Sequence, residues 1–175
     1  MWLPSVHIWI KYNTDGVGHG SPNPASYGGI FRDYQANFGC FVSNIDILYA
    51  LNAEIMDVIL AIELAYETTC THLCLESDSK LINLVFTQSK IIPWNLYHRW
   101  QNYLDFSRNT NFKVTHIYKE ENCCVGRMTN ISISVSSLTW WDNLPNSIKD
   151  DFHHNRLCLP LYKFYTFSLH QGFIS

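Results

Sequence analysis

Residues 8–16 read Ile8-Trp9-Ile10-Lys11-Tyr12-Asn13-Thr14-Asp15-Gly16, an apolar run that ends in a carboxylate followed by a glycine. Every second side chain from Ile8 to Tyr12 is apolar, so we expect a β-strand over residues 7–15. Asp15 then stands where this strand ends. A carboxylate at the edge of an apolar strand is costly to bury unless something compensates its charge. This segment therefore predicts a strand that carries an acidic side chain into a particular environment.

Two further carboxylates stand in comparable places. Glu54 lies in the first turns of an amphipathic stretch, and Asp78 directly follows the apolar run of residues 72–77. Taken alone, each of the three is explained by a solvated strand end or a helix cap, and Asp78 or Ser77 is a candidate cap for the next helix. Taken together, they suggest a shared compensator, and a divalent cation with oxygen ligands is the natural one.

The apolar pattern along the chain predicts an α/β domain. A loop over residues 16–24 lacks the Lys-Ser/Thr pair of a phosphate-binding loop, so we interpret it as a connection. We expect a strand pair at 27–33 and 38–43, strands at 72–77 and 112–118, and helices at 49–67, 78–87, 94–106 and 122–134. In the first helix Glu54 and Asp57 lie off a core-facing stripe made by Leu51, Ile55, Val58, Ile62 and Ala65. This order favours a mixed sheet with helices on both faces and a crevice at the strand ends.

The motifs around the three carboxylates follow one another in a specific order. They are Asp15-Gly16 with the glycine-rich segment up to Gly29, Ala53-Glu54, Glu76-Ser77-Asp78-Ser79-Lys80, and His116 to Asn122. In this order and spacing, residues 2–131 resemble the type 1 ribonuclease H family, particularly the plant branch associated with reverse-transcriptase-like retroelements. The resemblance implies a ribonuclease H-like mixed five-stranded sheet with helices on both faces. It also implies metal-dependent hydrolysis of the RNA strand of an RNA–DNA hybrid.

The resemblance assigns roles to individual residues. Asp15, Glu54 and Asp78 would be catalytic metal ligands for two Mg²⁺ or Mn²⁺ ions, with Asp15 shared by both. Ser79 and Lys80 would contact the sugar-phosphate edge of the hybrid, and Asn52 is a further candidate contact although it does not align cleanly with the family.

One position departs from the family pattern. The family places a fourth metal-binding aspartate four residues after the asparagine of its last motif, and here that position is Gly126. Two readings stay open: a hybrid endonuclease weakened at one metal, or a catalytically degenerate domain from a retroelement that binds nucleic acid or a protein. His116 has the spacing of a family histidine that assists product release, but its place in a strand favours core packing or a hydrogen bond.

Composition limits the class of protein. The chain has 175 residues, of which 47% are hydrophobic and 15% charged, as is typical of a globular domain. No apolar run approaches the roughly 20 residues of a membrane helix, and the N-terminus does not resemble a signal peptide. We therefore expect an intracellular protein, in nucleus or cytoplasm, with its cysteines reduced; a zinc site or disulfide has little support without a C-x-x-C motif. The net charge of −3 predicts weak, salt-sensitive binding of nucleic acid.

The C-terminal part differs in character from the rest. We expect a ribonuclease H-like domain over residues 1–135 and an aromatic-rich extension over 136–175, which includes Trp140-Trp141 and the segment 157–165. Such aromatic density favours packing on the domain or on a protein partner. We expect the last ten residues to be frayed.

Overall fold

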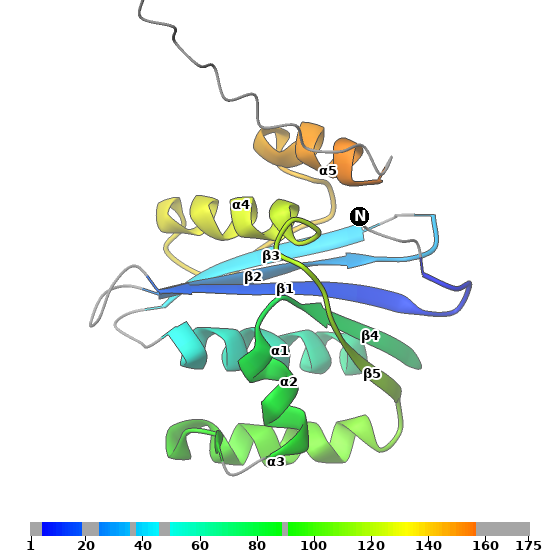
Figure 1. Ribbon diagram of the computed structural model, residues 1–175, viewed down its shortest axis with the longest axis vertical. Helices are drawn as coiled ribbons and strands as arrows, with labels where there is room; N and C mark the ends of the chain where they lie inside the picture. Colours follow the sequence, from blue (N-terminus) through cyan, green and yellow to red (C-terminus); the bar gives the residue numbers. More distant parts are fainter. Residues whose placement is uncertain (1–4, 19–24, 36–37, 46–49, 89–90, 157–175) are drawn as a thin grey trace, which may run out of the picture.

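A computed structural model describes residues 5–18, 25–35, 38–45, 50–88 and 91–156. A single mixed sheet forms the middle layer, with strand order β5-β4-β1-β2-β3-β6 (Figure 1). Its strands are β1 (Ile10–Gly18), β2 (Ala25–Arg32), β3 (Phe38–Ile45), β4 (His72–Ser77), β5 (Asn111–His116) and β6 (Thr139–Trp141). β1, β2 and β3 form an antiparallel meander, while β4 and β5 join β1 in parallel. The predicted α/β architecture with a mixed sheet is confirmed.

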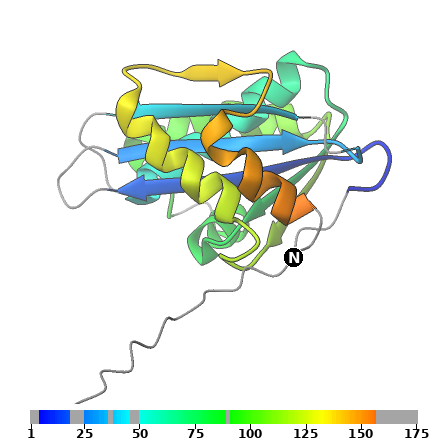
Figure 2. The same cartoon turned by 90° about the horizontal axis from the view of Figure 1, so that it is seen from above.

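Helices cover both faces of the sheet, as predicted (Figure 1). One face carries α1 (Ala50–Glu67), α2 (Lys80–Thr87) and α3 (Tyr97–Ser107), which follows the 3-10 turn Trp94–Leu96. The other face carries α4 (Cys123–Ile131), continued by the 3-10 turn Ser132–Ser134, and α5 (Lys149–Arg156), which follows the turn Asn146–Ile148; α4 and α5 lie side by side across the strands (Figure 2). Each face has its own apolar core. Within the described residues, no helix is long and apolar enough to cross a membrane.

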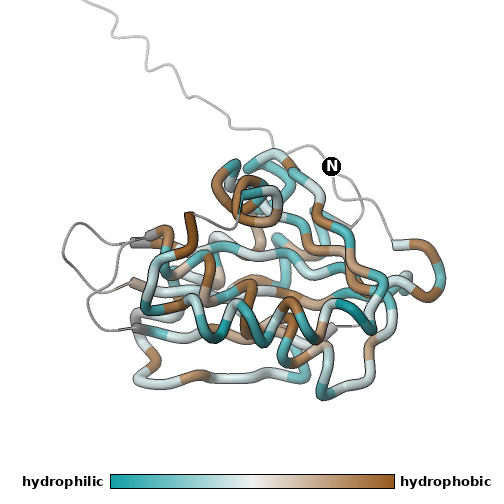
Figure 3. The backbone as a smooth tube through the Cα atoms, turned by 90° about the horizontal axis from the view of Figure 1, so that it is seen from below, coloured by the Kyte–Doolittle hydropathy of each residue, from teal (hydrophilic) through white to brown (hydrophobic). Residues whose placement is uncertain are grey.

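Helix α1 follows its predicted pattern closely. Four members of the predicted stripe, Ile55, Val58, Ile62 and Ala65, are buried, and Leu51 packs against them half-buried. Hydrophilic and hydrophobic segments alternate along the helices of this face (Figure 3). The 3.6-residue period of an amphipathic helix was therefore a sufficient signal for this element.

Strand β1 is longer than predicted at its C-terminal end. Its ladder with β2 runs to the pair Gly18 and Ala25, so Asp15 lies within the strand, opposite Gly28. The predicted loop is therefore wrong for residues 16–18, because the antiparallel ladder extends through the glycines; residues 19–24 lie outside the described part. The parallel ladder with β4 ends one residue before Asp15. Asp15 is thus paired on one side of its strand and open on the other.

The prediction of five strands is wrong, because the extension adds a sixth. Strand β6 pairs antiparallel with β3 along the pairs from Cys40–Trp141 to Val42–Thr139, and so covers the edge of the sheet. Further along, Leu144, Ile148 and Phe152 join the apolar core that also contains residues of α4. The described part of the extension therefore packs on the domain. The segment 157–165 and the last ten residues lie outside the described part, and the boundary at residue 135 stays a prediction.

Candidate functional site

A cleft of about 980 Å³ opens where β1 and β4 stop pairing. Its walls come from β1, α1, the segment after β4, the turn before α4, and α4 itself. The three carboxylates singled out in the sequence all face this one space. The lining residues are Asp15, Gly16, Val17, Glu54, Asp78, Ser79, Lys119, Glu120, Asn122, Cys123, Gly126, Arg127 and Asn130.

Strand pairing and helix packing bring the three acids together. Thr14 and Ser77 are the last parallel partners of β1 and β4, so Asp15 and Asp78 follow at the same end of neighbouring strands. Glu54 arrives from α1, which crosses β1 closely: a Cβ atom on Gly16 would lie 2.6 Å from the backbone nitrogen of Glu54. The glycine after Asp15 is therefore required for the approach of α1.

Each carboxylate accepts a hydrogen bond from the protein itself. The Thr129 hydroxyl donates to Asp15 Oδ2 at 3.1 Å, and the Ser79 hydroxyl donates to Glu54 Oε2 at 2.6 Å. Asn122 Nδ2 donates both to Asp78 Oδ1 at 2.9 Å and to the backbone oxygen of Thr14. Asn122 thus joins α4, β1 and the end of β4.

Asp78 does not cap the helix that follows it. Helix α2 begins at Lys80 with Ser79 as its N-cap residue, and no side chain makes a capping hydrogen bond there. The Ser77 hydroxyl accepts a bond from the Ser79 N–H, which orders the segment between strand and helix. The capping role considered for Asp78 or Ser77 is therefore wrong, and the Asp78 carboxylate is directed to the cleft side.

The electrostatics of the cleft disfavour three negative charges without compensation. The pKa of Asp15 is raised to about 6, mainly by burial and also by the nearby charge of Asp78. Burial likewise raises the pKa of Glu54 to about 7, with the charges of Asp15 and Asp78 adding to the effect and the Ser79 bond opposing it. The three acids are therefore close enough to interact electrically. A bound cation would have the opposite effect and lower the pKa values of these acids, because it favours the charged carboxylates.

The donor set of the cleft matches a hard cation in kind. Carboxylate, hydroxyl and amide oxygens are the ligands that Mg²⁺ and Mn²⁺ prefer. Asn122 is buried, and its side-chain oxygen has no hydrogen-bond partner within the described residues. Across that same part of the chain, no three acidic, histidine or cysteine side chains stand close enough to hold an ion. Ion binding would require the carboxylates of Asp15, Glu54 and Asp78 to move closer together within the cleft.

Gly126 occupies the wall opposite Asp15. A Cβ atom built on Gly126 would lie 3.5 Å from Asp15 Oδ2, so an acidic side chain at this position would face the same space. The next residue, Arg127, is basic, lines the cleft and pairs with Asp151 of α5 at 2.8 Å. Lys119 adds a second cation to the same rim.

The other predicted site residues fall in different places. Ser79 lines the cleft, whereas Lys80 is exposed at the start of α2 and Asn52 is buried within α1, and neither of these two lines the cleft. His116 is exposed at the end of β5, where its ring contacts Tyr118. Of the core packing or hydrogen bond predicted for His116, the core packing is wrong, because β5 is an edge strand and leaves His116 exposed. His153 and His154 are exposed on α5.

Sequence reasoning missed the role of Asp57. This side chain is fully buried beneath Asp15, where it accepts hydrogen bonds from the hydroxyls of Tyr12, at 2.7 Å, and Thr14. Burial raises its pKa to about 8. The available signal was its position one helical turn after Glu54, combined with two hydroxyls on the same face of the predicted first strand.

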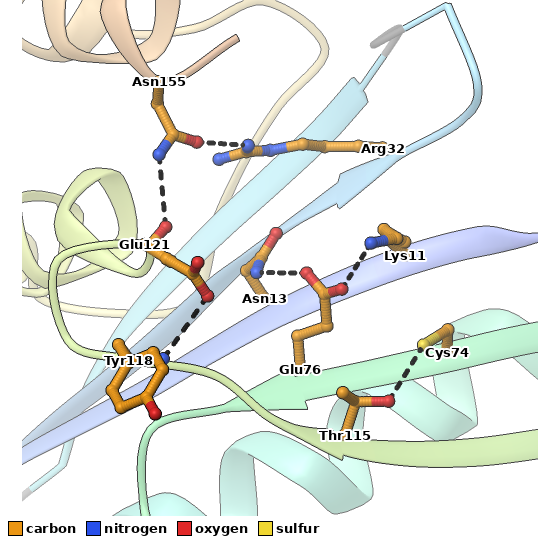
Figure 4. A network of polar contacts seen from close by, with 9 residues as sticks. All are labelled: Lys11, Asn13, Arg32, Cys74, Glu76, Thr115, Tyr118, Glu121 and Asn155. Carbon is orange, nitrogen blue, oxygen red and sulfur yellow. Dashed lines mark hydrogen bonds and ion pairs between the residues drawn. The ribbon is translucent and has the colours of Figure 1, made fainter. Parts of the chain in front are cut away.

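A second polar cluster lies on the face of β1 opposite to Tyr12 and Thr14, because successive side chains of a strand alternate between its faces. Figure 4 shows its contacts. The buried Glu76 of β4 accepts hydrogen bonds from Lys11 at 2.5 Å and from Asn13 at 2.9 Å. These contacts link β1 to β4 one and three residues before the strands separate. They help to hold the register that places Asp15 beside Asp78.

Comparison with known proteins identifies the family. Residues 13–130 match the family described as reverse transcriptase-like. The chain belongs to this family. A protein of Arabidopsis thaliana with ribonuclease H in its name is 29% identical over 140 residues, which are 77% of this chain. The chain spans 22% of the length of that relative.

Solved structures give the same fold for members of the ribonuclease H group. Ribonuclease H1 of Halobacterium salinarum superposes with a TM-score of 0.63 at 19% identity, over 72% of this chain and 98% of its own. The LC11 ribonuclease H1, solved in complex with an RNA/DNA hybrid, superposes with a TM-score of 0.63 at 22% identity, over 71% of this chain and 96% of its own. This reverse transcriptase-like chain therefore has the ribonuclease H fold predicted for it.

Proposed function

We propose that this domain is a metal-dependent ribonuclease that cleaves the RNA strand of an RNA–DNA hybrid, weakened by the absence of one carboxylate. The observation that carries the proposal is the arrival of Asp15, Glu54 and Asp78 at one cleft from three separate elements. The raised pKa values of Asp15 and Glu54 support it, because acids that destabilise one another are suited to share a cation. The LC11 relative, bound to a hybrid in its structure, supports the choice of substrate.

The residues of the cleft have distinct roles in this proposal. Asp15 would be the ligand shared by two ions, and Glu54 and Asp78 would complete the site of the ion nearer the leaving oxygen. Paired divalent ions supply stabilisation of charge on the attacking and leaving oxygens. Lys119 and Arg127 at the rim would contact substrate phosphates, as cationic side chains do. Ser79, which also lines the cleft, would contact the sugar edge of the RNA strand.

Gly126 sets the expected level of activity. With glycine at this position, the site that would hold the water-activating ion would have one negative oxygen fewer. A loss of about 4 kcal/mol in transition-state stabilisation would slow cleavage by about a thousandfold. The proposal therefore expects slow hydrolysis that is best supported by Mn²⁺ or high Mg²⁺.

Cleavage of a labelled RNA–DNA hybrid by the purified chain tests the proposal directly. The wild type should cleave the hybrid in a metal-dependent way and faster than Asp15→Asn, which keeps the size of the side chain but removes its charge. Equal rates for the two proteins at every Mn²⁺ concentration would reject catalysis at this cleft.

Substitution of Gly126, the residue that departs from the family pattern, gives a gain-of-function test. Gly126→Asp should raise the rate of hybrid cleavage by at least about tenfold, because about 1.4 kcal/mol of added stabilisation suffices for that gain. Gly126→Asn is the matched control, since it has the same shape without the charge. An equal gain from both variants would attribute the effect to helix packing and not to a metal ligand.

A second candidate function is a non-catalytic domain that binds nucleic acid or a protein partner. The cleft wall has Gly126 at the position of the fourth acid and the basic Arg127 next to it in the chain. This favours the second candidate, because cations there suit phosphate binding without hydrolysis. Hybrid binding by a wild type that never cleaves, together with no gain from Gly126→Asp, would support this candidate over the nuclease.

A further inference from the structure

Helix α5 belongs to the C-terminal extension, yet it contacts the segment that forms one wall of the cleft. Asn155 of α5 is 8% exposed, and both ends of its side-chain amide are engaged (Figure 4). Its oxygen accepts a hydrogen bond from Arg32 Nη1 at 2.8 Å, and its nitrogen donates to the backbone oxygen of Glu121 at 3.2 Å. Arg32 is itself held over the ring of Phe152, 4.7 Å from the ring centroid. Asn155 therefore links β2, through Arg32, to the residue that precedes Asn122.

The turn that Asn155 contacts is closed by its own hydrogen bonds. The backbone N–H groups of Glu121 and Asn122 both donate to the Tyr118 oxygen, at 2.9 and 3.2 Å. The Glu121 carboxylate in turn accepts a bond from the Tyr118 N–H at 3.4 Å. The turn of residues 118–122 is thus a small closed unit, and the bond from Asn155 anchors it from outside.

This turn delivers Asn122 to the site. Asn122 is the N-cap residue of α4, and its side-chain nitrogen reaches both Asp78 and the backbone oxygen of Thr14. A displacement of the turn would therefore move the group that orients Asp78. The path from α5 to the cleft runs from Asn155 to the Glu121 carbonyl, and from Asn122 to the Asp78 carboxylate.

A second contact joins α5 to the same wall. Asp151, one turn before Asn155, pairs with Arg127 of α4 at 2.8 Å, and the side chain of Asp151 is only 13% exposed. Arg127 lines the cleft beside Gly126. Helix α5 therefore contacts the wall at the turn before α4 and again within α4.

We propose that Asn155 is a positioning residue of the metal site, because it holds the turn 118–122 in the arrangement that lets Asn122 orient Asp78. This inference rests on the proposed function and adds the extension to the site. Groups that orient the ligands of a metal contribute to its affinity although they do not touch it. The extension then helps to orient a metal ligand of the cleft, and it also covers the edge of the sheet.

Calorimetric titration of the 175-residue chain with Mn²⁺ tests the inference without reference to activity. Asn155→Ala should weaken Mn²⁺ binding by about tenfold, the lower end of the effect of removing a group that orients metal ligands. Asn155→Asp should weaken it similarly, because aspartate keeps the acceptor for Arg32 but cannot donate to Glu121. Affinity retained by Asn155→Asp would assign the role to the Arg32 contact and overturn the proposal.

Two controls separate positioning from general destabilisation. His154→Ala changes an exposed neighbour on α5 and should bind Mn²⁺ as the wild type does. Ile148→Val removes one buried methyl group near α5 without touching the partners of Asn155, and it too should bind normally. A loss of affinity in Ile148→Val equal to that in Asn155→Ala would contradict a specific role for Asn155.

A second measurement follows the turn itself. In chelator, amide hydrogen exchange at residues 118–126 should be faster in Asn155→Ala than in Ile148→Val, whereas exchange in β1 should match. Mn²⁺ titration of Asp15→Asn separates a failure of the proposed function from a failure of the inference about Asn155. A wild type that binds no more Mn²⁺ than Asp15→Asn would reject the proposed function and the inference with it. A wild type that binds Mn²⁺ through Asp15 but is unaffected by Asn155→Ala would reject the inference alone.

Discussion

Asp57 is more deeply buried than any of the three acids of the cleft. It is fully buried and sits against hydroxyl groups from β1, with no cation among its hydrogen-bond partners in the described structure. Its pKa of about 8 means that the carboxyl group is mostly protonated at neutral pH. A neutral acid in this place bonds to Tyr12 and Thr14 and so ties α1 to the strand that carries Asp15.

This protonation predicts how stability depends on pH. The pKa of Asp57 is raised in the folded chain, so the folded state binds more protons than the unfolded state between about pH 4 and pH 8. The free energy of unfolding should therefore fall as pH rises through this range, with a slope of up to about 1.4 kcal/mol per pH unit from this group. Asp15 and Glu54 act in the same direction.

Asp57→Asn isolates the contribution of the buried acid. Asparagine has the shape of the neutral acid and does not titrate, so the variant should lose part of the pH dependence and gain stability at pH 8 relative to the wild type. Urea unfolding in chelator at several pH values measures this. A slope identical to that of the wild type would show that Asp57 does not titrate over this range.

The burial of Asp57 could not be predicted from the sequence, whereas the three acids of the cleft could be singled out. Asp15, Glu54 and Asp78 were identifiable because each interrupts or follows an apolar segment and each lies in a motif. Asp57 was read as lying off the apolar stripe of its helix, which is the usual position of a solvated acid. Its burial depends on hydroxyl donors about 45 residues earlier in the chain, and a helical period carries no information about them.

At the scale of elements, the packing of α1 against β1 decides whether Glu54 reaches Asp15. Gly16→Ala would place a Cβ atom 2.6 Å from the backbone of Glu54, and backbone cannot yield as a flexible side chain does. We expect a loss of about 1–3 kcal/mol in unfolding free energy, as for other overpacked contacts. Mn²⁺ binding should weaken as well, because α1 is displaced from the cleft.

Gly126→Ala is the matched comparison for this variant. Its Cβ atom would make an ordinary contact at 3.5 Å with Asp15, and alanine is favoured over glycine within a helix. This variant should therefore be more stable than the wild type by up to about 1 kcal/mol. Urea unfolding of both variants gives the measurement. Equal effects of the two substitutions would mean that the close approach at Gly16 has no energetic weight.

Long periodic elements were predictable, and short or glycine-rich ones were not. The stripe of α1 and the apolar run of β4 each carry enough residues to identify the element. The C-terminal end of β1 was read as loop because Gly16 and Gly18 suit loops, and only the partner β2 keeps them extended. Strand β6 has three residues, which is too short for an alternating pattern to be recognised.

For the whole molecule, the aromatic extension completes the fold. Trp140 of β6 lies against Gly39, where a Cβ atom would come within 2.2 Å of the indole, and stacks 6.2 Å from the ring of Phe41. The described extension also shares the apolar core of α4. The sequence predicted that such aromatic density would pack, because exposed apolar surface of that extent is unfavourable. It did not predict which sheet edge would receive it, since that depends on the unpaired side of β3.

Trp140→Ala tests whether the extension stabilises the whole domain. Trp140 retains 44% exposure, so removing its contacts with Gly39 and Phe41 should cost about 2 kcal/mol, less than for a fully buried tryptophan. Trp94→Ala is the matched control, because Trp94 is 89% exposed and its removal should change stability by less than about 0.5 kcal/mol. Urea unfolding, followed by circular dichroism so that loss of a fluorophore does not matter, compares the two. If the extension were an independent appendage, Trp140→Ala would unfold at the same urea concentration as Trp94→Ala, and β6 would contribute nothing to the stability of the sheet that holds Asp15.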